Sequence, residues 1–519
     1  MGVTYLSPGV YVEERDTGIK PIQAVGTSMA AFVGITAEAS KKRIDQETGE
    51  RVPEESCLNK AILISNWTEF TTYFGGFMDG AFLPDAVYGY FSNGGGPCYV
   101  TSLRALTDVD QESSAASAEI PSTGKATCFK VTATMAGPAG NNLKVTIKHN
   151  TAPDDKSPEA FTMSVGGQSL SGLNMKKSGS GTYIEEAEFD AITISDIGGA
   201  TLMPDEGVYP LTGGGLQPLS AEDFIGDPGK RTGLGGLEVQ DEIRLVLCPD
   251  VMAGYDGSDA AKARVRLVQE ALISHCERMR YRFAILDTPP DLTAQQAKEW
   301  KEYVNFDSSY AALYYPWIEV ADLSDNASLT KHVPPSGHMA GVYNRSDGER
   351  SVHKAPANEV IRGAVGLAQE ISRNEQDTLN PIGVNCIRAF PGRGIRVWGA
   401  RTLSSNGAWR YVNVRRLFIM VEASMDAGLQ WVVFEPNDTN LWARVTRDVT
   451  GFLRVVWRSG ALFGTTESQA FYVKCDEELN TQEIRDMGQL IIEVGMAPVK
   501  PAEFVIFRIS QWAGANAEE

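Results

Sequence analysis

Alternation of apolar strands with amphipathic helices between residues 241 and 315 limits the fold of this chain more than any other feature. Three apolar runs of strand length are separated by two stretches whose apolar residues recur at helical spacing. In chain order these segments lie at residues 243–247, 261–280, 283–286, 293–303 and 311–315. Repeated strand–helix units favour a parallel sheet covered by helices. We therefore predict an α/β domain over residues 220–380.

Residues 107–219 have a different composition, rich in Ser, Thr, Gly and Ala. Short alternating runs such as Leu143 to Ile147 are separated by Gly, Pro and Asn turn clusters. This pattern predicts a small all-β domain. Because residues 26–106 mix helix and strand as residues 220–380 do, we interpret the β-rich segment as an insertion into one α/β core.

A chain of 519 residues is too long for one hydrophobic core, so we expect several domains. Residues 381–498 are predicted to form a further, α+β domain. Within it, residues 412–421 and 430–434 resemble strands, and residues 439–457 have the pattern of a helix with one apolar stripe. That stripe consists of Leu441, Val445, Val449, Phe452 and Val456.

Both ends of the chain carry short strand-like runs. Pro8 to Glu14 is β-prone, and Glu503 to Ile509 is apolar on both faces. Chain ends normally fray, so apolar strands at both ends need a docking place. Two possibilities remain open: each strand completes a sheet of its own chain, or it is donated to the sheet edge of a neighbouring subunit.

Charge is distributed unevenly along the chain. The net charge is −19, but from residue 381 to the end 15 basic residues balance 15 acidic ones. Between Arg388 and Arg458 there are eleven Arg, no Lys and five acids. On the helix at 439–457 a second stripe, next to the apolar one, consists of Arg444, Arg447, Arg454 and Arg458. Arg without Lys favours bidentate contacts with carboxylates.

Part of this arginine set is expected to form internal salt bridges. The stripe on one helix face predicts a partner protein with an acidic surface. Nucleic acid is the competing partner, but the basic density and interleaved aromatic residues that it needs are missing elsewhere in the chain. We therefore predict no nucleic-acid binding.

Motifs that could carry catalysis are incomplete. Gly26 to Ala30 resembles the nucleophile segment of subtilisin-type proteases, but Ser28 precedes every histidine, an order that this family does not use. Lys125 is followed by Ala126, so no phosphate-binding loop is present. Gly392 to Gly394 lacks the third glycine of a dinucleotide-binding fingerprint. We predict a protein that is not an enzyme and binds no cofactor.

Two aspartates support the alternative hypothesis that the protein is an enzyme. Asp250 and Asp287 follow successive predicted strands, where open α/β sheets place ligand-binding groups. The alternative, which we favour, is that they cap loops and helix starts. An α/β enzyme with an accessory β domain is the competing hypothesis.

No metal site is expected. His332, His338 and His353 fit no zinc spacing and are interpreted as surface-loop residues, because residues 331–344 are rich in Pro and Gly. The seven cysteines contain no CxxC pair, which indicates a reducing compartment. The first residues have no signal-peptide pattern, and no apolar run approaches a membrane span, so we expect assembly in the cytoplasm and no direct membrane insertion.

Several segments resemble one known family. The segment PGVYVEE at residues 8–14 resembles the opening of contractile tail sheath proteins. The resemblance extends over most of the C-terminal block, in the segments IRVWGARTL at 395–403, WRYVNVRR at 409–416, FEPND at 434–438 and APVKPAEF at 497–504. The β insertion carries no signature of the family, as a variable outer domain would.

The resemblance implies a non-catalytic structural subunit of the helical sheath of a phage tail or a phage-tail-like injection particle. Such a sheath surrounds an inner tube and contracts to drive it through a target envelope. The α/β domain, residues 26–106 and 220–380, would have a subtilisin-like fold without protease activity. The implied partners are neighbouring sheath subunits, the inner tube, the baseplate and a tail-terminator or cap protein.

The resemblance also implies roles for particular residues. Arms at residues 1–25 and 499–519 would each add a strand to sheets of neighbouring subunits, and residues 381–498 would face the tube. The implied arm residues are Val10, Tyr11, Val12 and Glu13 at the N-terminus and Phe504, Val505, Ile506, Phe507 and Ile509 at the C-terminus. For tube contact we infer the helix at 439–458, through Arg444, Arg447, Arg454 and Arg458.

Overall fold

The computed structural model divides the chain into two compact units. It describes residues 22–44, 51–106, 114–124, 127–134, 138–149, 160–177, 181–195, 202–215, 218–324 and 329–508. The larger unit covers residues 27–415, and the smaller unit combines residues up to 26 with those from 416 onward. Both ends of the chain therefore belong to the same unit, and their described parts are residues 22–26 and 416–508.

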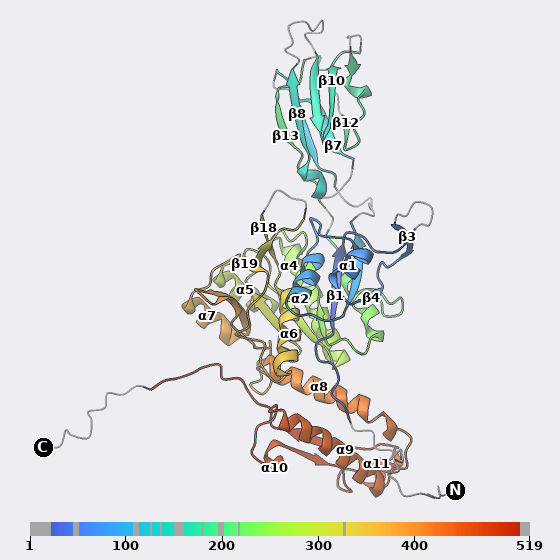
Figure 1. Ribbon diagram of the computed structural model, residues 1–519, viewed down its shortest axis with the longest axis vertical. Helices are drawn as coiled ribbons and strands as arrows, with labels where there is room; N and C mark the ends of the chain where they lie inside the picture. The colour runs from blue at the N-terminus through green and yellow to red at the C-terminus, as the bar shows by residue number, and fades with distance from the viewer. Residues whose placement is uncertain are drawn as a thin grey trace, which may run out of the picture. The chain divides into compact units, whose positions relative to one another are not determined.

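An eight-stranded sheet forms the centre of the larger unit (Figure 1). Its strands, in sheet order, are β21 (Gly394–Val397), β20 (Val384–Phe390), β16 (Ala311–Tyr315), β15 (Phe283–Asp287), β14 (Leu245–Leu247), β1 (Ala30–Thr36), β5 (Cys98–Ala105) and β4 (Ala61–Ile64). Neighbours from β20 to β5 run parallel, and the two edge strands β21 and β4 run antiparallel. The predicted parallel sheet is confirmed, and β16 has the predicted bounds.

The strands at the centre of this sheet are apolar along their whole length because they are buried along their whole length. Every residue of β1, β15 and β16 is buried, as expected for a parallel sheet with both faces covered. The helices of this unit are α1 (Trp67–Phe74), α2 (Leu83–Ser92), α3 (Ala221–Ile225), α4 (Asp259–Met279), α5 (Ala294–Val304), α6 (Ser336–Arg350) and α7 (Arg373–Leu379). Helices α4 and α5 match their predictions within two residues, and each begins after a hydroxyl cap, Ser258 or Thr293.

The prediction of a surface loop at residues 331–344 is wrong. This segment covers most of β18 (Thr330–Val333) and of α6, in which His338 is buried. A Cβ atom at Gly89 of α2 would collide with the His338 ring, and one at Gly341 would collide with the backbone of Tyr90. The glycines that suggested a loop are there because α2 and α6 pack at very close range.

Residues 114–215 contain two antiparallel sheets with a core of their own. The first sheet, in order, is β11 (Thr182–Tyr183), β10 (Gln168–Asn174), β9 (Phe161–Val165), β8 (Lys144–His149) and β13 (Gly207–Pro210); only β11 pairs in parallel. The second is β12 (Ile192–Ser195), β7 (Thr127–Ala133) and β6 (Ser117–Pro121). Inward-facing Val131, Ile147 and Phe161 lie in their shared apolar core.

Two small sheets complete the described strands of the larger unit. One contains β18, β17 (Ile318–Ala321) and β19 (Ala364–Leu367), and the other pairs β2 (Ser40–Ile44) with β3 (Arg51–Ser56).

The smaller unit is built mainly from two long helices and a short sheet. Its elements are α8 (Val412–Gly428, whose first turn belongs to the larger unit), α9 (Thr439–Arg458), α10 (Glu467–Ala470), β22 (Phe471–Lys474), α11 (Gln482–Asp486) and β23 (Glu493–Met496). The α9 helix matches its prediction within one residue. Residues 22–26 lie along α8, where the Val25 amide donates a hydrogen bond to Ser424 Oγ at 3.0 Å.

Two strand predictions in this region are wrong. Residues 412–421 begin α8, and residues 430–432 form a single 3₁₀ turn. Most of α8 is buried, and an apolar run buried on most sides cannot be assigned to helix or strand from its periodicity. Across the described residues, no helix is long and apolar enough to span a membrane.

Candidate assembly surfaces

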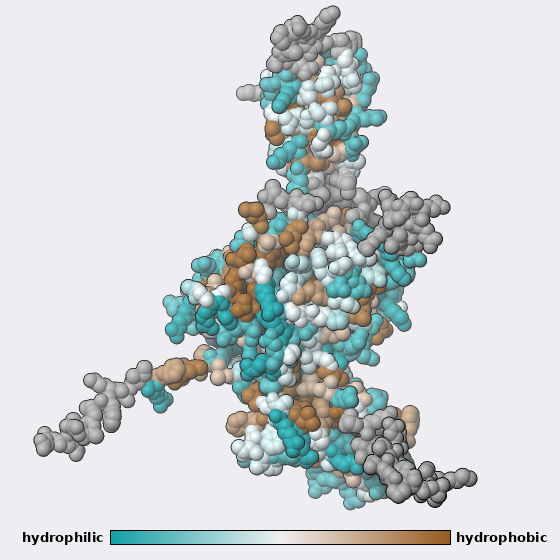
Figure 2. Space-filling view, in the orientation of Figure 1, coloured by the Kyte–Doolittle hydropathy of each residue, from teal (hydrophilic) through white to brown (hydrophobic). Residues whose placement is uncertain are grey.

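The described part of the C-terminal segment is apolar and exposed. Phe504, Val505, Ile506 and Phe507 are between 70% and 83% exposed, and Figure 2 shows brown surface where this segment leads to the C-terminus. Residues 501–508 pair with no strand among the residues that the structure describes. Fully burying a side chain of this size is worth roughly 1.5–3 kcal/mol. Four such side chains exposed to water therefore favour association with another surface.

The remaining predicted arm residues cannot be placed in the same way. Val10, Tyr11, Val12, Glu13 and Ile509 lie outside the described residues. Their assignment to intersubunit strands stays a prediction.

A two-stranded sheet in the same unit has both outer edges open within the described part of the chain. Strands β22 and β23 run antiparallel, with Tyr472 opposite Gly495. The Ala497 amide donates to the Ala470 carbonyl at 2.9 Å, which fixes the alternation of the ladder. By that alternation the backbone groups of Val473 and Val494 point away from the partner strand, toward the open edges.

An isolated two-stranded ribbon is marginally stable at best in water. Helix α9 packs against β22, which covers one face of the ribbon but supplies no hydrogen bonds to its edges. The sequence analysis missed this sheet because each strand has only four residues. The only signal was the aromatic and β-branched run Phe471, Tyr472, Val473.

The four arginines of α9 lie on one side of the helix and are partly paired within the unit. Arg454 forms a bidentate contact with Glu467, with Nη2 and Oε2 3.0 Å apart. Arg444 Nη1 lies 3.4 Å from Glu435 Oε2, and its guanidinium stacks 4.3 Å from the Trp431 ring centroid. Internal ion pairs were expected for part of the set, and these contacts confirm that.

These ion pairs do not exhaust the capacity of the guanidinium groups. The Arg444, Arg447 and Arg454 side chains are 45%, 57% and 41% exposed, and Arg458 is exposed. Each guanidinium has five N–H donors, so an internal carboxylate leaves donors available to a second partner. The face can therefore bind further carboxylates.

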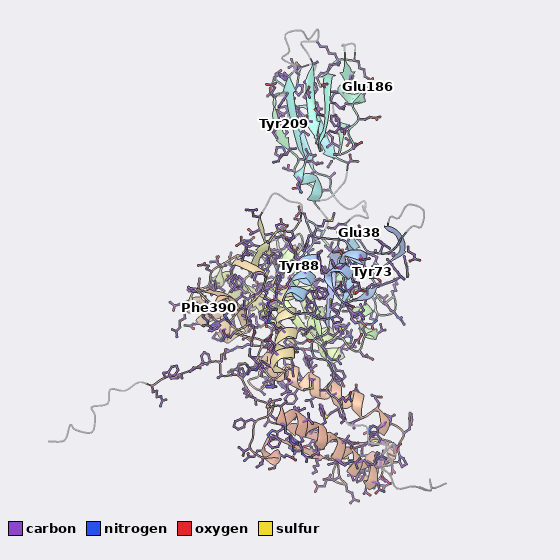
Figure 3. The ribbon with its side chains drawn as sticks, in the orientation of Figure 1. Glu38, Tyr73, Tyr88, Glu186, Tyr209 and Phe390 are labelled. Atoms are coloured by element: carbon purple, nitrogen blue, oxygen red, sulfur yellow. The ribbon has the colours of Figure 1, made fainter. Side chains whose placement is uncertain are left out.

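Other arginines of the set make contacts inside the larger unit. Arg388 and Arg393 stack on Phe390, the β20 residue labelled in Figure 3, with guanidinium-to-centroid distances of 5.3 and 5.5 Å. Arg415 lies between Tyr310 and Trp409 at 4.6 and 4.5 Å from their ring centroids. These contacts are internal, so the candidate surface is limited to α9.

Asp250 and Asp287 hold helix starts in place. The Asp250 carboxylate accepts hydrogen bonds from the amides of Ile35 at 2.5 Å, of Phe82 and of Leu83 at 3.2 Å, at the first turn of α2. Asp287 Oδ1 accepts one from the Ser336 amide at 2.8 Å, at the start of α6. Burial raises the pKa of both carboxyl groups to about 7. The favoured capping role is confirmed for both.

The histidines form no ligand set among the described residues. His338 is buried in α6, where burial lowers its pKa to about 4 and keeps the ring neutral. His332 is an exposed residue of β18. No group of three or more His, Cys, Asp or Glu side chains in the described ranges could hold a metal ion.

Comparison with known proteins identifies a single family. Two family models match adjacent segments: "Phage tail sheath protein central domain" at residues 244–403 and "Phage tail sheath C-terminal domain" at residues 404–511. Together they cover more than half of the chain. A protein described as a prophage major tail sheath protein of Pseudomonas aeruginosa is 28% identical over 298 residues, which are 55% of this chain and 71% of that protein.

Solved structures support the same assignment. The helical sheath of the anti-feeding prophage in its contracted state has 25% sequence identity and a TM-score of 0.59, covering 98% of this chain and 100% of the other. A chain in the baseplate structure of the same particle has 25% identity and a TM-score of 0.56, covering 98% and 99%. With its matched domains, its relatives and its fold in agreement, this chain belongs to the contractile tail sheath family and is a structural sheath subunit.

Proposed function

We propose that this sheath subunit polymerises helically around an inner tube and that arms at its two ends tie neighbouring subunits together. The observation that carries the proposal is that the smaller unit has both an exposed apolar segment and strands with open edges. The apolar segment 504–507 is exposed, and within the described part of the chain β22 and β23 each have an open edge. Strand addition satisfies both, because edge hydrogen bonds hold the backbone and alternate side chains become buried.

Two open edges match two arms. We propose that the C-terminal arm, residues 499–519, and the N-terminal arm, residues 1–25, of different neighbours add to opposite edges of β22–β23. The resulting four-stranded sheet would have enough strands and packed faces to be stable. Each subunit would then be linked to others through flexible segments while its folded units repack as rigid bodies during contraction.

The arginine face of α9 supports contact with the tube. Its guanidinium groups are partly exposed after their internal pairing, and a partner that lies against them needs carboxylates. We propose that, of the predicted domain at residues 381–498, the part in the smaller unit, from residue 416, faces an acidic surface of the inner tube through Arg444, Arg447, Arg454 and Arg458. Contraction then drives the tube through a target envelope.

Other parts of the chain take supporting roles in this proposal. The α/β core, residues 26–106 and 220–380, would form the subtilisin-like, non-catalytic body of the subunit, and residues 107–219 an outer domain. Assembly would take place in the bacterial cytoplasm, starting at a baseplate and ending at a terminator or cap protein. Energy would be stored in the subunit interfaces, without a nucleotide or other cofactor.

Negative-stain electron microscopy of three proteins tests the proposal. The full-length chain, a version lacking residues 1–20 and a version lacking residues 500–519 are each mixed with tube and baseplate proteins. Striated tubes from the full-length protein alone are the expected result. Striated tubes from both truncated versions would refute strand-linked assembly, and small particles from all three would refute the sheath polymer itself.

A further inference from the structure

The solvent-facing side of α9 has a glycine at its centre. At about 100° per residue, Gly451 lies within about 20° of Arg444 and Arg458 around the helix axis, seven residues from each. Apart from the local helix backbone, no heavy atom of the described residues would lie within 4 Å of a Cβ atom added there. Gly451 is therefore a notch in the middle of the arginine face.

Within the described part of the unit, no packed neighbour requires a glycine at this position. Gly89 and Gly341 of the larger unit mark places where a Cβ would collide with a packed neighbour. Gly451 has no such neighbour, and its φ is not in the left-handed region. Glycine in a helix interior is less favourable than alanine, so this residue weakens α9 without an internal reason.

The neighbouring residues on this face indicate that the reason for the glycine is contact with another molecule. Val455, one turn after Gly451, is 66% exposed, although the opposite side of α9 is buried. A Cβ-free position next to an exposed apolar side chain lets a foreign backbone come into van der Waals contact with the helix. Arginines at both ends of the same strip then supply charge contacts.

We propose that Gly451 is the point of closest approach between α9 and the inner tube. The inference rests on the proposed tube-facing role of α9 and adds the shape of the partner. At 1.5 Å per residue, Arg444 and Arg458 lie about 10 Å on either side of Gly451. The tube surface that fits is a ridge of backbone with small side chains, flanked along the helix by carboxylates at about that spacing.

Variants at two helix glycines, Gly451 and Gly348, test the proposal. Gly348 of α6 is the control, because it is an exposed helix glycine that, like the half-buried Gly451, has no described heavy atom beyond the local helix backbone within 4 Å of an added Cβ. Gly451→Leu, Gly451→Ala and Gly348→Leu are compared with the natural protein. Three quantities are measured: Tm of the subunit, tube-free polymerisation by light scattering, and cosedimentation with purified preassembled tubes.

We expect the substitutions at Gly451 to weaken tube binding without impairing folding. Gly451→Leu should weaken cosedimentation at least tenfold without lowering Tm or tube-free polymerisation, and Gly348→Leu should leave cosedimentation unchanged. Gly451→Ala should raise Tm and still weaken cosedimentation several-fold. If Gly451→Leu unfolds the unit, Gly451→Ala decides the outcome.

Charge reversal separates this inference from the proposed function. If Arg444→Glu with Arg458→Glu abolishes cosedimentation while Gly451→Leu binds tubes normally, close approach at Gly451 is refuted and the tube-facing role of α9 stands. If neither variant changes cosedimentation, the tube-facing role fails as well. If Gly451→Leu blocks tube-free polymerisation, the occupant of the face is a second sheath subunit, and the proposal is overturned.

Discussion

The eight-stranded sheet of the larger unit and the two-stranded sheet of the smaller unit solve the problem of a sheet edge in different ways. In the larger sheet, six parallel strands are flanked by antiparallel edge strands from the same chain, and helices cover its faces (Figure 1). In the smaller sheet, both strands are edges. Among the described residues, the first sheet keeps its parallel strands away from its edges and has the outer side of β21 paired with residues 358–361. The second leaves hydrogen-bonding groups on both of its strands and, in the adjoining segment, apolar side chains for a partner.

This difference separates stability from assembly. Changes in the larger sheet should act on folding of the single chain. Changes at the open sheet and in the arm should act on polymerisation and leave folding unaltered. Each variant below is chosen to fall on one side of that division.

The largest effect is expected from Ile506→Pro. Proline has no backbone N–H and cannot donate to a sheet edge, so the arm should not pair and sheath assembly should be lost. Ile506 is 79% exposed in the single chain, so the Tm of the monomer should not change. Electron microscopy and thermal unfolding measure the two quantities.

Ile506→Ala is the matched control, because it removes the side chain but keeps the backbone donor. Assembly should be weakened but present. If Ile506→Pro assembles as fully as the natural protein, backbone pairing of the arm is not needed.

Asp250→Ala should have the largest effect on the free energy of unfolding. It leaves the buried backbone amides of Ile35 and Leu83, and the partly buried amide of Phe82, without their acceptor. An unsatisfied buried donor costs roughly 1–3 kcal/mol, so we expect destabilisation of about 3 kcal/mol or more. Chemical denaturation of the monomer measures it, with the exposed Asp256→Ala as control. A change no larger than that of the control would contradict the capping role.

A smaller, pH-dependent effect is expected at Asp287. Its pKa is raised from 3.8 to about 7 by burial, so the folded state binds a proton that the unfolded state has lost. This group's contribution to stability therefore falls as the pH rises from about 4 to about 7, by up to a few kcal/mol, and is level above that range.

Asp287→Asn keeps an acceptor for the Ser336 amide and cannot ionise. The variant should lose that part of the pH dependence and become more stable than the natural protein at pH 8. Parallel stability curves for the two proteins between pH 4 and pH 8 would rule out titration of Asp287 in this range.

The smallest effect on folding is expected from the Arg454–Glu467 pair. Both side chains are about 40% exposed, so a double-mutant cycle of Arg454→Ala and Glu467→Gln should give a small coupling energy that decreases with added salt. Tube cosedimentation should fall more with Arg454→Ala than with Glu467→Gln. Equal loss in both variants would assign the pair a purely internal role.

Local pattern was enough for the elements whose apolar residues follow a single period. The α9 stripe and the capped helices α4 and α5 were predicted within two residues. The α6 and α8 helices were not, because burial on most sides removes the polar face that marks a helical period. In α6, glycines required by close packing also imitate a loop.

Composition and periodicity are local properties, and they were enough to predict an α/β core, an apolar terminal segment and an arginine-rich helix face. Which of those arginines are paired internally, and which described strands have open edges, depends on how the chain packs. Arg454 meets Glu467 through the turn after α9, and β22 meets β23 across about twenty intervening residues. Hydrogen-bond partners that are distant in the chain are set by chain packing, and only packing reveals the backbone groups and the notch at Gly451 that remain for another molecule.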